Sequence, residues 1–248
     1  MDPDQDRLTF LKNYLLQREK GLDAALLPLG HPGGKDVLVF GCGKGSEILW
    51  CATHKARTTL GVDLHPIDTG ALSSLLHERG QDDFNYAMAQ IDVHDLALSR
   101  PAQFDLILSN GVFEHVSDMK GVLNAFRALL RPGGRISIYA DGLWFSSIGG
   151  HLGRDNWEHL WMSESDIRQN FPARWPAYKS HLNRMTCVDF MNAVRDVGAL
   201  VLQFRIRSDP YLKRMPMLID KMRAKQELSP TDLSITSIAC ELCFIEHL

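Results

Sequence analysis

The chain has 248 residues, of which 45% are hydrophobic, enough to bury the core of one large domain or of one domain with a cap. The net charge of −3 and the pI near 6.4 argue against a polyanion-binding surface, so no nucleic acid is expected as a partner. No apolar run approaches the ~18–20 residues of a membrane span, and the acidic residues 1–4 are unlike a signal peptide, so we expect a cytoplasmic protein with no membrane partner.

The five cysteines agree with that expectation, because an odd number of scattered thiols is not a disulfide framework. Cys240 and Cys243 form a C-x-x-C pair, yet residues three apart in a strand point to opposite faces. We therefore predict that both are ordinary buried thiols.

A helix is predicted over residues 7–28, where leucines recur at three- and four-residue spacing. The glycines and proline of residues 30–34 end it before the first strand. In the simplest interpretation the helix packs beside a sheet. Covering a cofactor and making a homodimer contact are the alternatives.

Strands and helices then alternate as far as residue 140. The predicted strands are 36–40, 58–63, 86–91, 104–109 and 135–140, and the predicted helices are 46–54, 69–79 and 118–130. This alternation predicts a doubly wound α/β fold, because right-handed crossovers place helices on both faces of a parallel sheet.

The first strand runs into a glycine loop, since residues 37–40 are apolar and residues 41–45 read G-C-G-K-G. Glycines there permit dihedrals and a close backbone approach that a Cβ would forbid. A strand, a tight glycine turn and a helix start together form the nucleotide-binding entrance of a doubly wound sheet, with the ligand at the carboxyl end of the strand.

The second strand ends in an acid, Asp63, which lies 22 residues after Gly41. A carboxylate there can accept both hydroxyls of a ribose. Dinucleotide dehydrogenases use the same geometry, but the third glycine of their G-x-G-x-x-G fingerprint would fall on Ser46.

Four stretches together resemble the class I S-adenosylmethionine-dependent methyltransferases, in that family's order and spacing over about residues 35–140. They are the glycine loop, residues 90–96 as the third-strand segment, residues 104–116 as the fourth strand with its loop, and residues 129–139, similar to the L-x-P-G-G turn. The resemblance implies a Rossmann-like seven-stranded sheet with an antiparallel last strand. It also implies S-adenosylmethionine as cofactor and S-adenosylhomocysteine as product.

The same resemblance implies which residues hold the cofactor. The backbone of the glycine loop would contact the methionine portion, Asn110 would face that end, Asp63 would take the ribose, and Asp92 with Val93 would hold the adenine. The full set is Gly41, Cys42, Gly43, Gly45, Asp63, Leu64, Asp92, Val93 and Asn110. The chain departs from the family at Val39, where many members carry an acid that helps to organise the methionine end.

Residues 141–184 interrupt the alternation and contain four of the chain's five tryptophans. Because an insertion at the carboxyl edge of the sheet hangs over the cofactor, we predict a substrate lid; a small aromatic core for a long loop is the alternative. The chain then divides into an N-terminal helical segment (1–34), a cofactor-binding core (35–140), the lid and closing elements (185–248). An excursion over 208–233 either lines the substrate pocket or forms a solvated helix.

A sulfonium methyl group is already activated, so the protein must align the acceptor with it and exclude water. For a hydroxyl acceptor, histidine is the usual general base near neutral pH. The candidates are His151 and His159 in the lid, the latter close in sequence to Asp155 and Glu158, and His115 after the fourth strand. No metal site is assigned, because sequence spacing cannot show that several oxygens converge on a cation.

The prediction is a methyltransferase that acts on an oxygen of a small-molecule or sugar-containing acceptor, in polysaccharide or natural-product biosynthesis. Residues 109–113 read S-N-G-V-F in place of Asn/Asp-Pro-Pro-aromatic, which disfavours methylation of nucleic-acid bases. Two alternatives stay open. A catalytically inactive methyltransferase-like binding protein is favoured by Val39, and a nicotinamide-dependent oxidoreductase is disfavoured by Ser46.

Overall fold

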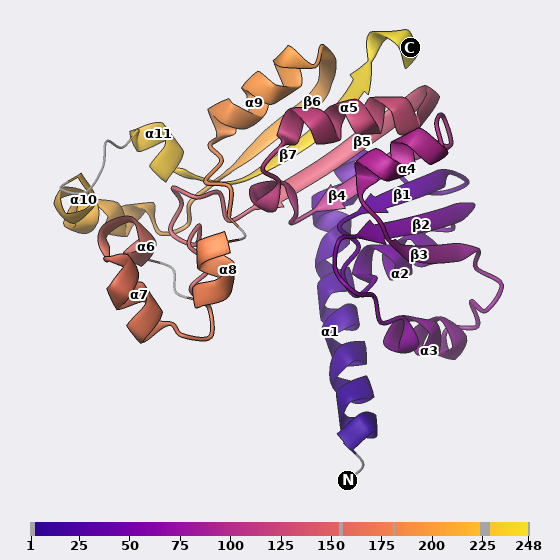
Figure 1. The fold of residues 1–248 in the computed structure, drawn as a ribbon, viewed down its shortest axis with the longest axis horizontal. Coiled ribbons are helices and arrows are strands. Elements are labelled where there is room, and N and C mark those ends of the chain that lie inside the picture. Colours follow the sequence, from indigo (N-terminus) through magenta and orange to yellow (C-terminus); the bar gives the residue numbers. More distant parts are fainter. Residues whose placement is uncertain (1–2, 154–155, 181, 224–228, 248) are drawn as a thin grey trace.

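The computed structural model describes residues 3–153, 156–180, 182–223 and 229–247. Within them, seven strands form one sheet in the order β3-β2-β1-β4-β5-β7-β6 (Figure 1). They are β1 (Asp36–Phe40), β2 (Thr58–Asp63), β3 (Tyr86–Gln90), β4 (Phe104–Asn110), β5 (Leu130–Asp141), β6 (Ala199–Ser208) and β7 (Ile235–Phe244). β1 to β5 pair in parallel, whereas β7 is antiparallel to β5 and β6. The predicted doubly wound sheet with an antiparallel last strand is confirmed.

Helices cover both faces of this sheet in Figure 1. One face carries α1 (Pro3–Leu26), α2 (Ser46–Thr53) and α3 (Gly70–Glu78), and the other carries α4 (Val93–Ser99), α5 (Met119–Leu129) and α9 (Cys187–Asp196). No helix was predicted where α4 lies. Its start is explained by Asp92, whose side chain accepts a hydrogen bond from the backbone N–H of His94 and so caps the first turn.

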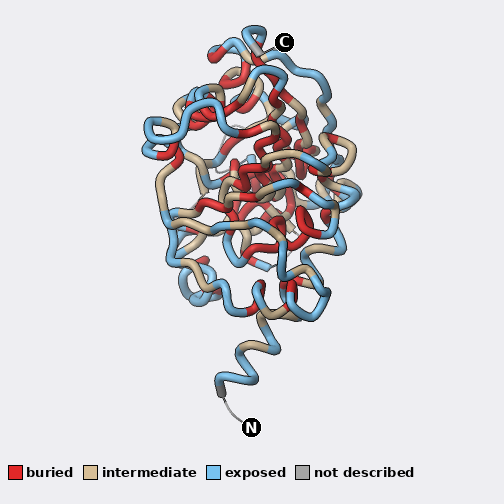
Figure 2. Tube along the Cα trace, turned by 90° about the vertical axis from the view of Figure 1, so that its right-hand side faces the viewer, coloured by how far each residue is buried: buried red, intermediate tan, exposed pale blue. Residues whose placement is uncertain are grey.

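The long helix α1 packs beside the sheet along its second half. Leu15, Leu22 and Leu26 are buried there in the core that α1 shares with α2 and α3. The N-terminal end of the helix extends beyond the body of the protein in Figure 2. In its first half, Phe10 and Tyr14 are exposed. The leucine spacing therefore correctly predicted which face of the helix packs against the core. The helix begins at Pro3, however, and not at residue 7.

The central strand β1 is buried on both faces. Val37 and Val39 face the core under α1 to α3, whereas Leu38 and Phe40 face the opposite core under α4, α5 and α9. β2 and β4 pair with its two edges. A strand enclosed in this way needs apolar residues at every position, which explains its unbroken hydrophobic run.

Strand β5 is longer than predicted. It starts at Leu130, which pairs with Phe104, and the regular register resumes only at the Leu106–Arg135 pair. The predicted P-G-G turn is therefore an irregularity inside the strand pairing, with Gly133 in the left-handed region at a φ of 79°.

A helical cap gathers at one end of the sheet, on the left of Figure 1. The predicted lid supplies α6 (Glu158–Trp161), α7 (Glu164–Asn170) and α8 (Trp175–Ser180), and the excursion supplies α10 (Met215–Arg223) and α11 (Pro230–Leu233). They share one core, in which Trp157, Met222 and Leu233 are fully buried. Met222 and Leu233 thus attach the excursion to the cap, whereas its basic residues Lys213, Arg214, Lys221 and Arg223 are exposed, as a solvated basic helix would have them. The role of residues 141–184 as a substrate lid stays a prediction.

Short 3-10 helices complete the described elements: η1 (Leu27–Leu29), η2 (Phe113–His115), η3 (Leu212–Arg214) and η4 (Ile245–His247). Cys240 and Cys243 are fully buried in β7 with free thiols, as predicted. Among the described helices, none is both long enough and apolar enough to cross a membrane.

One buried carboxylate joins the two halves of the cap. Asp209, which follows β6, is 2% exposed. Its Oδ2 accepts a hydrogen bond from the backbone N–H of Ser147 at 2.6 Å, and its Oδ1 accepts from the Ser147 hydroxyl at 3.0 Å and from the N–H of Tyr211 at 2.8 Å. Asp209 thereby holds the segment after β5 against the segment after β6.

We expect Asp209→Ala to lower the free energy of unfolding by about 2–4 kcal/mol, because buried donors lose a charged acceptor. Urea unfolding followed by tryptophan fluorescence measures the change. Asp220→Ala on the exposed side of α10 is the matched control, with an expected change below about 0.5 kcal/mol. Equal stability of the two variants would show that Asp209 does not join the cap.

Candidate functional site

The carboxyl ends of β1, β2 and β4 lie side by side, and the predicted glycine loop occupies the first of them. Gly41, Gly43 and Gly45 have φ values of 73°, 50° and 95°, in the left-handed region that a side chain disfavours. A Cβ on Gly41 would overlap Val112, and one on Gly45 would lie 2.7 Å from a methyl of Leu72. A Cβ on Gly43 would meet no atom within 4 Å. The loop is therefore tight against the protein and open on the side of Gly43.

Asp63 ends β2 beside this loop. Its Oδ2 accepts a hydrogen bond from the N–H of Gly43 at 2.9 Å, and its Oδ1 accepts from the N–H of His65 at 2.9 Å. Burial opposes ionisation of Asp63, but the donors from His65 and Gly43 prevail and hold its pKa below the usual value. Asp63 is therefore an ionised hydrogen-bond acceptor at the carboxyl edge of the sheet. The next residue, Leu64, is 64% exposed.

The predicted adenine residues follow β3. Asp92 caps α4 through its 2.8 Å hydrogen bond from His94, and Val93 is buried in the first turn of that helix. One carboxylate oxygen of Asp92 is therefore already engaged within the protein. The structure brings Asp92 to the same carboxyl edge as Asp63, because β3 pairs with β2 in parallel and in register up to the Asp63–Gln90 pair.

Asn110, at the end of β4, leads to two residues that the sequence analysis missed. Its Nδ2 donates to Oε1 of Glu47 at 2.7 Å, and Glu47 is a 5% exposed carboxyl in the first turn of α2. Arg18 of α1 reaches the same place, because its Nη2 lies 3.8 Å from where a Cβ on Gly111 would be. An acid next to the glycine loop was visible in the sequence, whereas nothing in it signalled Arg18, which reaches the edge only through the packing of α1.

Two of the three predicted histidines meet at the edge where β4 and β5 end. His115 ends η2 and His151 belongs to the cap segment, and their rings lie 5.3 Å apart at 87°. Burial and the neighbouring His115 lower the pKa of His151, so its imidazole is neutral at pH 7. His151 holds a left-handed φ of 52°, a conformation that side-chain-bearing residues rarely adopt.

Two carboxyls adjoin this histidine pair. Glu114 is 4% exposed, and its Oε1 lies 4.0 Å from Nε2 of His115. Its Oε2 and the Oδ1 of Asp141 are buried, and neither has a hydrogen-bond partner among the residues that the structure describes. Burial, together with the charge of Asp141, raises the pKa of Glu114 to about 8. Within the described residues, no group of three or more His, Cys, Asp or Glu side chains is arranged to hold a metal ion.

His159 lies apart from this pair, in the core of the cap. It is 5% exposed, its Nε2 lies 2.6 Å from the carbonyl oxygen of Trp144, and burial lowers its pKa to about 4. Its ring packs 5.0 Å from the ring of Trp144. Of the two acids predicted to orient it, Glu158 begins α6 and Asp155 lies outside the described residues.

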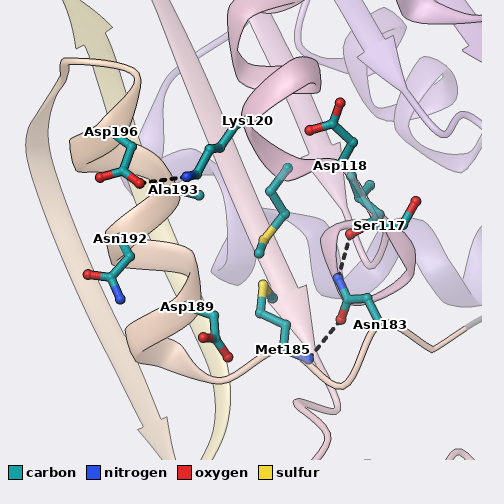
Figure 3. A pocket seen from close by; sticks show the side chains of 11 residues that line it. Ser117, Asp118, Lys120, Asn183, Met185, Asp189, Asn192, Ala193 and Asp196 are labelled. Atoms are coloured by element: carbon teal, nitrogen blue, oxygen red, sulfur yellow. Dashed lines mark hydrogen bonds and ion pairs between the residues drawn. The ribbon is translucent and has the colours of Figure 1, made fainter.

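A pocket of about 430 Å³ lies between the start of α5, with the residues just before it, and one side of α9 (Figure 3). Asn183 forms part of its wall and donates from Nδ2 to the carbonyl oxygens of Phe113 at 2.6 Å and Val116 at 2.7 Å. The other labelled residues in Figure 3 include Lys120, whose ammonium pairs with Asp196 at 2.6 Å. The predicted cofactor residues and histidines do not line this pocket.

Comparison with known proteins places residues 38–136 in a family model described as a methyltransferase domain. The ubiquinone biosynthesis O-methyltransferase of Acinetobacter baumannii (strain AYE) is 30% identical over 109 residues, which cover 43% of this chain and 44% of that protein. The corresponding protein of Dechloromonas aromatica (strain RCB) is 35% identical over 105 residues, 42% of this chain and 44% of the relative. The match therefore spans less than half the length of these curated relatives.

Solved structures resemble the chain over more of its length at lower identity. Geranyl diphosphate C-methyltransferase from Streptomyces coelicolor A3(2), solved with Mg²⁺, geranyl diphosphate and S-adenosyl-L-homocysteine, aligns with a TM-score of 0.56 and 16% identity over 92% of this chain and 80% of that one. The [4+2]-cyclase SpnF aligns with a TM-score of 0.57 and 14% identity over the same shares of the two chains. Likeness at this level establishes the fold, which serves more than one reaction.

We expect Glu114→Gln to change how stability depends on pH. The raised pKa means that folded Glu114 keeps a proton which the unfolded chain loses above about pH 4.5, so the free energy of unfolding falls as pH rises from about 5 to 8. Glutamine does not titrate, so the variant does not lose this part of the free energy of unfolding. Each unit of pKa difference between the folded and unfolded states corresponds to about 1.4 kcal/mol. The variant should therefore gain at most about 5 kcal/mol of stability relative to the wild type at the upper end of the range.

Urea unfolding of both proteins at several pH values between 5 and 8 measures this difference. Glu164→Gln, on exposed Glu164 of α7, is the matched control and should follow the wild type at every pH. A constant difference between Glu114→Gln and the wild type across the range would contradict the raised pKa.

Proposed function

We propose that this chain, whose residues 38–136 match a methyltransferase domain model, is a class I S-adenosylmethionine-dependent methyltransferase that transfers a methyl group from S-adenosylmethionine to a small-molecule acceptor. The observation that carries the proposal is the open glycine loop beside the ionised Asp63, at the carboxyl edge of a sheet ordered 3-2-1-4-5-7-6. A nucleoside needs a backbone that permits close approach and an acceptor for its ribose hydroxyls, and this edge offers both.

The described residues fit this cofactor part by part. Asp63 would accept the ribose hydroxyls, exposed Leu64 would cover one face of the adenine, and Asp92 with Val93 would flank its edge. The backbone of Gly41, Cys42, Gly43 and Gly45, with Asn110, would surround the methionine end. When bound, the cofactor supplies an electrophilic methyl group on a sulfonium. The chain's own residues hold that group, exclude water and manage the acceptor's proton.

The acceptor atom that we propose is an oxygen of a small molecule or of a sugar. His115 and His151 support this choice, because a neutral imidazole beside the carboxyl ends of β4 and β5 can take a hydroxyl proton as the O–CH₃ bond forms. Glu114, within 4.0 Å of His115, would help to orient that ring. We do not extend the proposal to His159, since its Nε2 is engaged with Trp144 in the core of the cap.

The first test is calorimetric titration of the protein with S-adenosylmethionine, S-adenosylhomocysteine and NAD. We expect saturable micromolar binding of the first two, about −8 kcal/mol, and none of NAD. Asp63→Ala should weaken binding about 10- to 100-fold, because two ribose hydroxyls lose a charged acceptor. The matched control is Asp82→Ala after α3, where the carboxylate is exposed and pairs with His77.

Binding of NAD alone would overturn the proposal in favour of an oxidoreductase. Binding of both sulfur compounds without methyl transfer to any phenol, alcohol or sugar in a broad acceptor screen would favour a binding protein that does not transfer methyl groups.

We expect His115→Asn and His151→Asn to lower kcat about 10²- to 10⁴-fold with the acceptor that turns over, while the Kd for S-adenosylhomocysteine changes less than about twofold. The physical reason is that each variant keeps the polarity of the edge but removes a base. His77→Asn, on exposed His77 of α3, is the control. Full turnover in both variants would contradict the assignment of the base to this pair.

A further inference from the structure

Glu47 is a carboxyl group buried at the glycine loop. It follows Ser46 in the first turn of α2 and is 5% exposed. Burial raises its pKa, while the hydrogen bond from Asn110 and the positive charge of Arg18 oppose that rise. A buried carboxylate is costly unless a cation or several donors stand beside it. The arrangement therefore favours a cationic group next to Glu47.

The position of Glu47 matches one end of the proposed cofactor. Asn110 lies at the carboxyl end of β4, directly before Gly111. Its Nδ2 donates a hydrogen bond to Oε1 of Glu47 at 2.7 Å. Arg18 of α1 lies close to Gly111, where Oε1 of Glu114 lies too, and its positive charge acts on the carboxyls of both Glu47 and Glu114. The charges of Asp63 and Glu47 both raise the pKa of Cys42, which places this loop residue near both carboxylates. The ribose acceptor and Glu47 therefore adjoin the same loop.

We propose that Glu47 binds the α-ammonium group at the methionine end of the cofactor, with Arg18 facing the α-carboxylate. This assignment rests on the proposed function. An amino-acid zwitterion presents one positive and one negative group a few ångströms apart, and Glu47 and Arg18 offer the complementary pair. Asn110 acts as a positioning residue that aims the Glu47 carboxylate. Residue 39 of β1 is the neutral Val39, which packs in the core that β1 shares with α2. The acid that we assign to the methionine end therefore comes from α2 and not from β1.

Binding of an ammonium group at Glu47 should change the protonation of this carboxyl. The groups that face Glu47 are Arg18 of α1, Asn110 of β4, and the thiols of Cys42 and Cys51, whose own raised pKa values keep them neutral. A bound ammonium lowers the pKa of Glu47, so binding releases protons at any pH at which the free protein still holds one on this carboxyl. Affinity should therefore fall as the pH is lowered through the pKa of free Glu47.

The test compares two ligands on wild-type protein and on Glu47→Gln. S-adenosylhomocysteine carries the amino-acid end, whereas 5′-methylthioadenosine has the same adenosine and sulfur without it. We expect Glu47→Gln to weaken the first ligand about 10- to 100-fold and to leave the second within about twofold. Retained binding of 5′-methylthioadenosine shows that the loop of the variant is folded. Glu164→Gln is the matched control and should bind both ligands as the wild type does.

Calorimetry in two buffers of different ionisation enthalpy gives a second readout that needs no turnover. We expect the wild type to release protons when it binds S-adenosylhomocysteine, and Glu47→Gln to lose most of that release. Equal weakening of both ligands, or unchanged affinity for S-adenosylhomocysteine, would overturn the assignment while leaving the proposed function intact. Failure of the wild type to bind either ligand would overturn the proposed function itself, and this assignment with it.

Discussion

Burial of β1 on both faces is the constraint on which the rest of the structure depends. Val37 and Val39 lie in one core, Leu38 and Phe40 in the other, and β2 and β4 close the two edges. A strand enclosed in this way is open only where it ends, so the glycine loop is the place at which a ligand can approach the centre of the sheet. The loops after β2, β3 and β4 meet it there because the strands are parallel.

The acids at this edge differ in protonation because they differ in burial and in donors. Asp63 accepts from two backbone N–H groups and stays ionised. Glu114 is more deeply buried and stands near Asp141, so it holds its proton at neutral pH. Burial also raises the pKa of Glu47, and one amide donor and the charge of Arg18 oppose that rise. One edge of the sheet thus offers a fixed negative charge, a neutral acid and a carboxyl that can respond to a cation.

The cap depends on a different interaction from the sheet. Its aromatic core is closed by segments that follow β5 and β6, and the buried Asp209 holds them together through Ser147 and Tyr211. This arrangement gives His159 a packing partner in Trp144 while leaving His151 beside His115. Two histidines eight residues apart in one segment therefore have different surroundings, which explains why their spacing alone did not distinguish them.

The sequence by itself determined the sheet, the glycine loop and Asp63, because apolar alternation, glycine spacing and an acid at a strand end are local patterns. It also identified the cap segment through its tryptophans, without showing that Met222 and Leu233 complete the same core. Only the tertiary structure decided that Arg18 stands by Gly111, that Asn110 holds Glu47 and that His115 meets His151. Those contacts join residues far apart in the chain, and their distances follow from how helices pack on the sheet rather than from any local periodicity.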